Sequence, residues 1–150
     1  MRWEWGILIL IFVLILVIGY YVKYTPRSGK AIESVIINGS RINIETADTI
    51  MKQAKGLSGR NSLRFGEGML FVYKKAGFYS FWMKDMNFPI DIIWIDENFL
   101  IVDITSNIQP DSFPRTFVGQ KASKYVLEIN AGAAKNIAKV GDIVTFDYAH

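Results

Sequence analysis

The hydrophobic pattern of the chain divides into one long apolar run followed by many short ones. No residue from Trp5 to Val22 is charged, and about 18 apolar residues in a helix cross about 30 Å of hydrocarbon. Aromatic residues flank the run at both ends, where their rings favour the membrane interfaces. Bulky residues follow it, where a signal peptide would have small ones. We therefore expect residues 1–24 to be a retained transmembrane helix.

The short apolar runs predict a separate domain. Pro and Gly in residues 25–33 indicate a linker, and residues 34–150 alternate apolar runs with turn residues. Runs of strand length recur at 69–73, 78–83, 90–95, 99–104, 125–129 and 143–148. With few helical segments between them, they favour a mostly β fold over a βαβ fold. The expected architecture is a small β-sandwich or an irregular barrel with one or two short helices.

Local signals add detail to this picture. Asn38-Gly39 between two apolar runs predicts a hairpin over 34–45, because these residues adopt positive φ readily. Residues 47–55 have helical spacing, with Thr46 or Asp48 as candidate N-caps. The polar stretch 106–124 is long enough to be a lid or a binding loop.

Composition and charge exclude several kinds of site. The net charge is only +3 and the basic residues are spread along the chain, so no nucleic-acid partner is expected. Cysteine is absent and the single histidine is His150, which removes thiolate or His-based metal sites and a Ser-His-Asp triad. Asp85, Asp91 and Asp96 lack the spacing of a calcium loop. We expect neither a metal nor a cofactor.

The charges around the apolar run leave its orientation open. Lys23, Arg27 and Lys30 follow the run and only Arg2 precedes it, so the positive-inside rule would put the domain in the cytoplasm. A very short N-terminal tail before such a run instead favours insertion like a signal sequence. Composition alone does not decide between the two.

Two acids occupy apolar strands. Asp91 and Glu128 each have apolar neighbours on both sides, and a carboxylate in such a strand needs hydrogen-bond donors. One hypothesis is a carboxylate-dependent, hydrolase-like enzyme in which the two act as acid and base. The favoured alternative is structural, with both acids bonded to backbone N–H groups or to a basic residue such as Arg60 or Lys84.

A second group of residues predicts a binding surface. Aromatic and polar side chains follow one another after the run 78–83, as in many ligand sites. The candidate binding residues are Trp82, Met83, Lys84, Asp85, Asn87 and Pro89, together with Arg60. The ligand would be a glycan or a peptide. In the alternative interpretation, Trp82 and Met83 belong to the core and residues 85–87 form a turn.

Several short segments resemble one family. In chain order they are Gly56–Arg60 (GLSGR), Gly68–Val72 (GMLFV), Phe81–Lys84 (FWMK), Pro89–Ile93 (PIDII), Tyr125–Gly132 (YVLEINAG) and Gly141-Asp142. Their order and spacing over about 35–147 resemble the domain-of-unknown-function family 192, although Ser58 stands where that pattern usually has Met. The resemblance implies a mostly β, sandwich-like domain without an established activity, often secreted or membrane-anchored. We therefore expect an extracytoplasmic, membrane-anchored ligand-binding or accessory module, with the carboxylate enzyme as the alternative.

Overall fold

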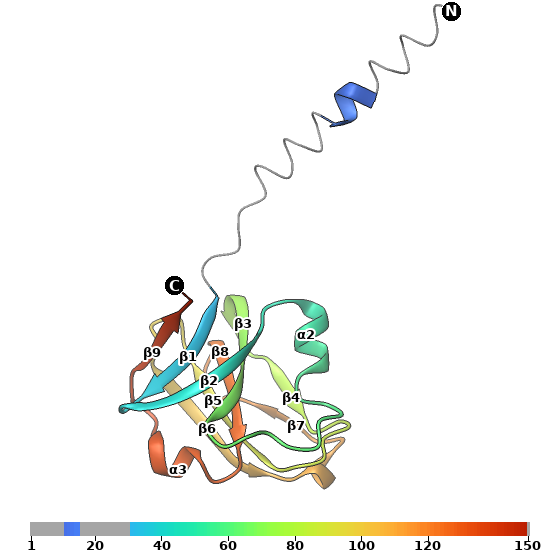
Figure 1. Ribbon diagram of the computed structural model, residues 1–150. Coiled ribbons are helices and arrows are strands. Elements are labelled where there is room, and N and C mark those ends of the chain that lie inside the picture. The colour runs from blue at the N-terminus through green and yellow to red at the C-terminus, as the bar shows by residue number, and fades with distance from the viewer. Residues whose placement is uncertain (1–10, 16–30, 150) are drawn as a thin grey trace, which may run out of the picture. The chain divides into compact units, whose positions relative to one another are not determined.

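The computed structural model describes residues 11–15 and 31–149 (Figure 1). Residues 11–15 are helical, and most of the predicted anchor at 1–24 and linker at 25–33 lies outside the described residues. Within the described part, no helix has both the length and the apolar character needed to cross a membrane. The chain divides into two compact units, Met1–Lys30 and Ala31–His150. The anchor and the linker remain predictions.

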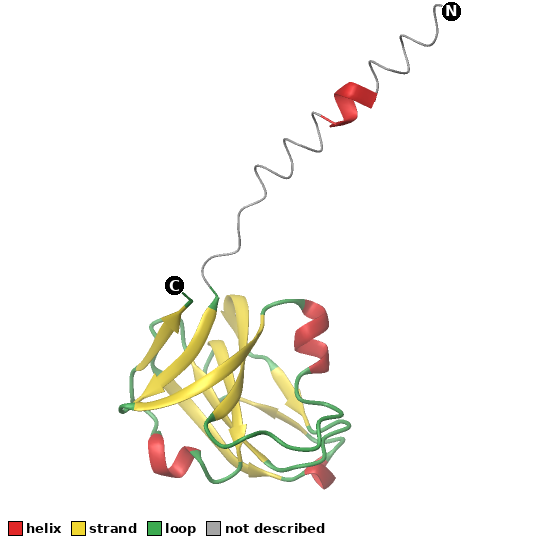
Figure 2. Cartoon of the chain, in the orientation of Figure 1, coloured by secondary structure: helices red, strands yellow, loops and turns green. Residues whose placement is uncertain are grey.

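The second unit is mostly β, as predicted, and Figure 2 shows strands predominating over three short helical segments between residues 31 and 149. The strands are β1 (Ile32–Ile37), β2 (Ser40–Ala47), β3 (Glu67–Gly77), β4 (Ser80–Trp82), β5 (Ile90–Ile95), β6 (Ile101–Ile108), β7 (Thr116–Val118), β8 (Ser123–Asn130) and β9 (Val144–Tyr148). The helical segments are α2 (Ile50–Lys55), the 3-10 turn η1 (Pro110–Ser112) and α3 (Ala134–Ile137).

Seven strands form one sheet in the order β6-β5-β8-β3-β2-β1-β9, and β4 pairs with β7 separately. The large sheet is not closed. Its edge strands nevertheless meet at one end, where Leu100 bridges Ile143 and the Val144 N–H donates to the Phe99 carbonyl at 2.8 Å. These bonds cover part of both sheet edges, which would otherwise offer unpaired backbone groups to other chains.

One connection differs from the prediction. Strands β2 and β3 are parallel, and α2 lies in the connection between them. A parallel pair needs such a crossover because a tight turn can join only antiparallel neighbours. The sequence favoured a fold without βαβ connections because its helical segments were few, and α2 is only one short helix. The chain therefore contains one crossover in an otherwise antiparallel sheet.

The predicted turn and helix are confirmed with one correction. Asn38 and Gly39 have φ values of 49° and 80° and join β1 to β2. The N-cap of α2 is Thr49, whose side chain accepts a bond from the Lys52 N–H. The predicted caps were Thr46 or Asp48, but β2 continues through Ala47 and holds Thr46 in extended backbone.

The predicted loop at 106–124 contains ordered elements. It begins within β6 and includes η1 and β7. Within this segment, residues 116–118 of β7 pair with residues 80–82 of β4. In Figure 1, α2 lies on the same side of the molecule as the β4–β7 pair. The predicted loop is therefore fixed in part by strand pairing.

The core consists of two clusters of buried side chains. One includes Phe71, Ile92 and Trp94, and the other includes Leu70 and Ile93. Successive residues of a strand point to opposite faces, so β3 and β5 contribute to both clusters. All six residues of β5 are buried. Asp91 on β5 and Glu128 on the neighbouring strand β8 are both buried.

Candidate functional site

Glu128 is a buried acid without a partner. It lies on β8 opposite Met69 of β3 and Ile92 of β5, and it shares their face of the sheet. Only 5% of the residue is exposed, and its Oε2 atom has no hydrogen-bond partner among the described residues. Burial raises the pKa of this carboxyl group to about 8, because the charged form loses its hydration. The group is therefore mostly protonated at neutral pH.

Glu128 faces a small pocket of about 60 Å³, which is enough for water or a small polar group. The pocket is formed by the end of α2 with the loop that follows it, by β3, by β4 and by one residue of the next turn. Its lining residues are Gln53, Ala54, Lys55, Gly56, Leu57, Ser58, Phe71, Tyr73, Ser80, Phe81, Trp82, Met86 and Glu128. We call this the Glu128 pocket.

Gly56 keeps space open above the acid. It ends α2 with a φ of 51°, a conformation that glycine adopts without the steric cost of a Cβ. A Cβ atom there would lie 3.3 Å from Phe71 Cζ and 4.0 Å from Glu128 Oε2. Any larger residue would therefore enter the pocket and strain the turn.

Aromatic side chains hold the pocket wall in place. Phe81 packs edge-on against both Phe71 and Trp94, with ring centroids 4.8 and 5.3 Å apart. Tyr73 stacks on Tyr79 with its centroid 3.4 Å away. Burial, followed by Tyr79 and Glu128, raises the pKa of Tyr73 above its ordinary value. Tyr73 thus stays a neutral phenol beside the acid.

Asp91 has a different environment. It lies opposite Ile129, so its side chain occupies the other face of the sheet from Glu128. Its Oδ1 accepts from the Asn107 N–H at 2.7 Å and its Oδ2 from the Ala134 N–H at 2.9 Å. These bonds tie the end of β6 and the start of α3 to β5. The structure does not bring Asp91 and Glu128 together. Of these two acids, only Asp91 accepts hydrogen bonds from backbone N–H groups of the described residues.

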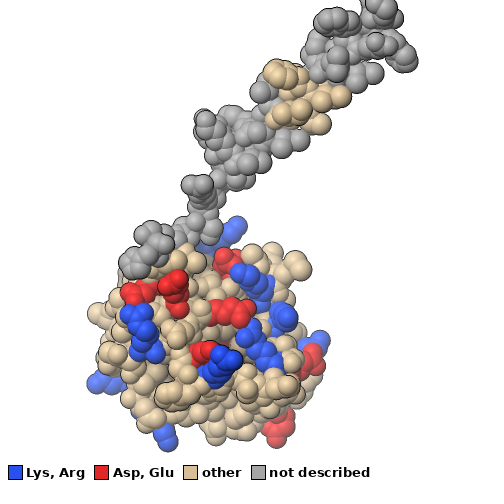
Figure 3. Space-filling view, viewed as in Figure 1, with Lys and Arg blue, Asp and Glu red and all other residues tan. Residues whose placement is uncertain are grey.

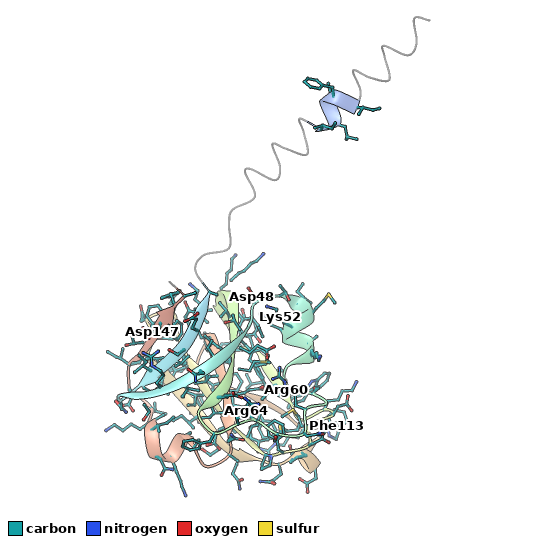
Figure 4. The ribbon with its side chains drawn as sticks, in the orientation of Figure 1. Asp48, Lys52, Arg60, Arg64, Phe113 and Asp147 are labelled. Carbon is teal, nitrogen blue, oxygen red and sulfur yellow. The ribbon has the colours of Figure 1, made fainter. Side chains whose placement is uncertain are left out.

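The predicted basic partner is also elsewhere. Arg60, which is labelled in Figure 4, forms an ion pair with Glu45, 2.5 Å from Nη2 to Oε2. Its backbone carbonyl accepts a 2.9 Å bond from the Asn87 side chain. Arg60 therefore holds two loops together and contributes to neither acid.

The predicted binding residues are separated by the turn that they form. Trp82 is 53% exposed and lines the Glu128 pocket, whereas Met83 is buried in the core. The Met86 N–H donates to the Met83 carbonyl, and Asp85 has a φ of 55°. The remaining predicted residues, Lys84, Asp85, Asn87 and Pro89, do not line the pocket.

The sequence argument named Glu128 and Trp82 but missed the residues that approach the pocket from other segments. Gly56 and Ser58 come from the first of the family-like segments and Phe71 from the second. The available signal was the convergence of these segments, but their pairing in space is decided by contacts distant in sequence.

A larger hollow of about 290 Å³ lies at another part of the sheet. Phe65, Ile129 and Ile137 are among its lining residues. In the part of the chain that the structure describes, the buried side-chain atoms without a partner are Ser123 Oγ and Glu128 Oε2, and neither lines this hollow. The smaller pocket therefore has the stronger chemical basis for a specific site.

Comparison with known proteins assigns a family. The profile of DUF192, described as an uncharacterised ACR, matches residues 33–146. A crystal structure from Sinorhizobium meliloti 1021, described provisionally as a transcription regulator, is 28% identical with a TM-score of 0.72, covering 80% of this chain and 97% of that one. A protein of unknown function from Novosphingobium aromaticivorans DSM 12444 is 33% identical with a TM-score of 0.71, covering 80% and 89%. The search of curated proteins found no significant match.

Proposed function

The chain belongs to the DUF192 family of uncharacterised proteins, and on that premise we propose that its β domain is a ligand-binding module whose site is the Glu128 pocket. The observation that carries the proposal is the buried Oε2 atom of Glu128, which has no partner within residues 31–149. A buried polar group without a hydrogen bond costs free energy. A ligand that forms a hydrogen bond to this oxygen recovers that free energy. An apolar residue at position 128 would carry no such cost.

The entrance of the pocket fits one end of a longer ligand. Trp82 lines the pocket and is half exposed, and its ring lies edge-on to Phe113 with centroids 6.1 Å apart. Exposed aromatic rings contribute contact area to peptide and glycan ligands. The volume of the pocket limits the inserted part to a few heavy atoms. The remainder of the ligand would lie outside, across Trp82.

We further propose that the module is held at a membrane and faces away from the cytoplasm. The support is the uncharged run from Trp5 to Val22 and the frequent secretion or anchoring that the family resemblance implies. A reporter that is active only in the cytoplasm, fused after His150, should then be silent. Strong reporter activity would show that Lys23, Arg27 and Lys30 keep the domain in the cytoplasm.

The description of the S. meliloti protein as a transcription regulator is not extended to this chain. On the face shown in Figure 3, Lys and Arg are interspersed with Asp and Glu. Ion pairs within the second unit include Arg41–Asp147, Lys52–Asp48 and Arg60–Glu45. A nucleic-acid surface needs clustered basic side chains that are free to bind phosphates. We therefore propose no nucleic-acid partner.

The second candidate function is a hydrolase-like enzyme, and one observation favours it. A carboxyl group with a pKa of about 8 holds its proton at neutral pH and can act as a general acid. The predicted acid and base pair must be revised, because Asp91 and Glu128 face opposite sides of the sheet. In this alternative Glu128 would act as proton donor without Asp91.

Binding is tested by observing the acid itself. The full-length protein, labelled with ¹³C at the glutamate carboxyl carbons, is titrated with butylamine, butanamide, sodium butanoate and methyl glucoside in turn. The Glu128→Gln variant identifies the Glu128 signal. The proposal expects at least one of these compounds to shift that signal in a saturable way. If none shifts it, the pocket is not a binding site.

A further inference from the structure

The polar side chains around Glu128 present mostly hydrogen-bond acceptors to the pocket. The amide nitrogen of Gln53 donates to the carbonyls of Ala47 and Val72 at 3.2 and 3.0 Å. Both of its N–H groups are therefore used, and only the oxygen of this amide remains for a ligand. The residue lines the pocket together with Glu128.

Ser58 is limited in the same way. Its hydroxyl donates to the Lys84 carbonyl at 2.8 Å, so the oxygen can only accept from a ligand. Ser80 and Tyr73 also line the pocket, and each hydroxyl can act as donor or acceptor. A ligand group that donates several hydrogen bonds therefore matches this arrangement, with the carboxyl of Glu128 as the strongest acceptor once it is ionised.

Aromatic rings form much of the pocket wall. The rings of Phe71, Tyr73, Phe81 and Trp82 line it. Phe71 directs its Cζ atom toward Gly56, and Tyr73 stacks one face on Tyr79. The half-exposed ring of Trp82 is therefore the one that remains for a cation–π contact with a ligand. An ammonium group is compact and has three donors, whereas a guanidinium group is larger and planar. A primary ammonium group therefore suits the pocket in size as well as in charge.

We propose that the Glu128 pocket binds a primary ammonium group, as found in a lysine side chain or a small amine, through an ion pair with Glu128. This inference rests on the proposed ligand-binding function and specifies its ligand class. On binding, the Glu128 carboxyl group loses its proton to bulk water. The resulting carboxylate accepts hydrogen bonds from the ammonium group, and no covalent bond is formed.

The charged and titratable neighbours of the acid are few. Lys55 of α2 lines the pocket rim, and Tyr73 of β3, stacked on Tyr79, lies beside the acid. The residue opposite on β5 is the apolar Ile92. Because Glu128 has a pKa of about 8, its ionised fraction rises about fiftyfold between pH 6 and pH 8. Ammonium affinity should rise by the same factor.

The experiment compares three probes of equal chain length and different head group. Butylamine, butanamide and sodium butanoate are titrated into the full-length labelled protein at pH 6 and pH 8, and the Glu128 carboxyl signal is followed. Butylamine, present as butylammonium, should bind more tightly than the other two by about tenfold at pH 8, with affinity increasing by about fiftyfold from pH 6. Glu128→Gln lacks this signal, so its butylammonium binding is measured by calorimetry beside the wild type; its affinity should be lower and should not change between pH 6 and pH 8.

A variant on the rim separates the alternatives. Lys55→Met removes a positive charge from the lining and should strengthen butylammonium binding severalfold. If butanoate binds best, and Lys55→Met weakens it, the pocket takes an anion. If butanamide binds best, and more weakly at pH 8 than at pH 6, the protonated acid recognises a neutral group. Either outcome overturns the ammonium inference and preserves the binding function, whereas failure of every probe overturns both.

Discussion

Asp91 and Glu128 lie on adjacent strands, β5 and β8, and their carboxyl groups occupy opposite faces of the sheet. The pairing register causes this, because Asp91 is opposite Ile129 and Glu128 is opposite Ile92, and residues directly across a ladder share a face. One carboxyl group receives two backbone N–H bonds. The other has an oxygen with no partner and faces a pocket. The first arrangement holds neighbouring elements to β5, and the second is the one on which we base the proposed binding site.

Replacing Asp91 should destabilise the domain. Asp91→Ala leaves the Asn107 and Ala134 N–H groups without their acceptor, at about 1–3 kcal/mol for each buried donor. We expect the melting temperature to fall by about 8 °C or more, at about 4 °C per kcal/mol. Thermal unfolding at pH 7 measures this.

The matched control for Asp91 is Glu97→Ala, an acid on an exposed turn. Its stability should stay within about 0.5 kcal/mol of the wild type. If Asp91→Ala had the melting temperature of the wild type, the two backbone hydrogen bonds would contribute nothing to stability.

Glu128 should make the stability depend on pH. The folded-state pKa of about 8 exceeds the ordinary value of 4.5, so between these pH values the folded protein holds a proton that the unfolded chain has released. The contribution of Glu128 to the free energy of unfolding is therefore fully present below pH 4.5 and is lost as the pH rises to about 8. Gln does not titrate. The free energy of unfolding of Glu128→Gln, relative to that of the wild type, should therefore rise by about 1.4 kcal/mol per pH unit across this window.

Urea unfolding of both proteins at several pH values measures that difference. It should level off above pH 8, once Glu128 is ionised in both states. A difference that stays constant from pH 4.5 to pH 8 would show that the folded-state pKa of Glu128 is ordinary.

Gly56 should control access to the pocket. Gly56→Ala puts a methyl group 3.3 Å from Phe71 Cζ, near Glu128 Oε2, so butylammonium binding should weaken at least tenfold. Gly59 also has positive φ, but a Cβ there meets no atom within 4 Å. Both Ala variants should lose about 1–3 kcal/mol of stability because a Cβ is strained at positive φ. Equal effects of the two variants on binding would contradict this role for Gly56.

Trp82 should contribute to binding and little to stability. It is half exposed at the pocket, and a cation–π contact at such a site contributes about 0.5–1 kcal/mol. Trp82→Ala should therefore weaken butylammonium binding about two- to fivefold while the melting temperature changes little. Phe65→Ala, which removes a fully exposed ring outside this pocket, is the control and should leave binding unchanged.

The sequence predicted the local features and missed those set by pairing. Asn38-Gly39 identified its hairpin because the turn depends on two adjacent residues. The apolar neighbours of Asp91 and Glu128 correctly indicated that both acids are buried. Alternation along one strand, however, does not say how β5 is aligned with β8, so the opposite orientation of the acids could not be deduced. The strand assignment likewise could not tell which of Trp82 and Met83 points outward.

The most direct test of the central claim is the pKa of the Glu128 carboxyl group in the full-length protein. Carboxyl ¹³C spectra recorded from pH 4 to pH 10 follow its ionisation, with Glu128→Gln identifying the signal. The account predicts a midpoint near 8, because burial without a partner disfavours the charged form. Saturation with butylammonium should lower that midpoint. A midpoint near 4.5 without ligand would show that the carboxylate already has a partner or water, and would contradict the assignment of this pocket as the binding site.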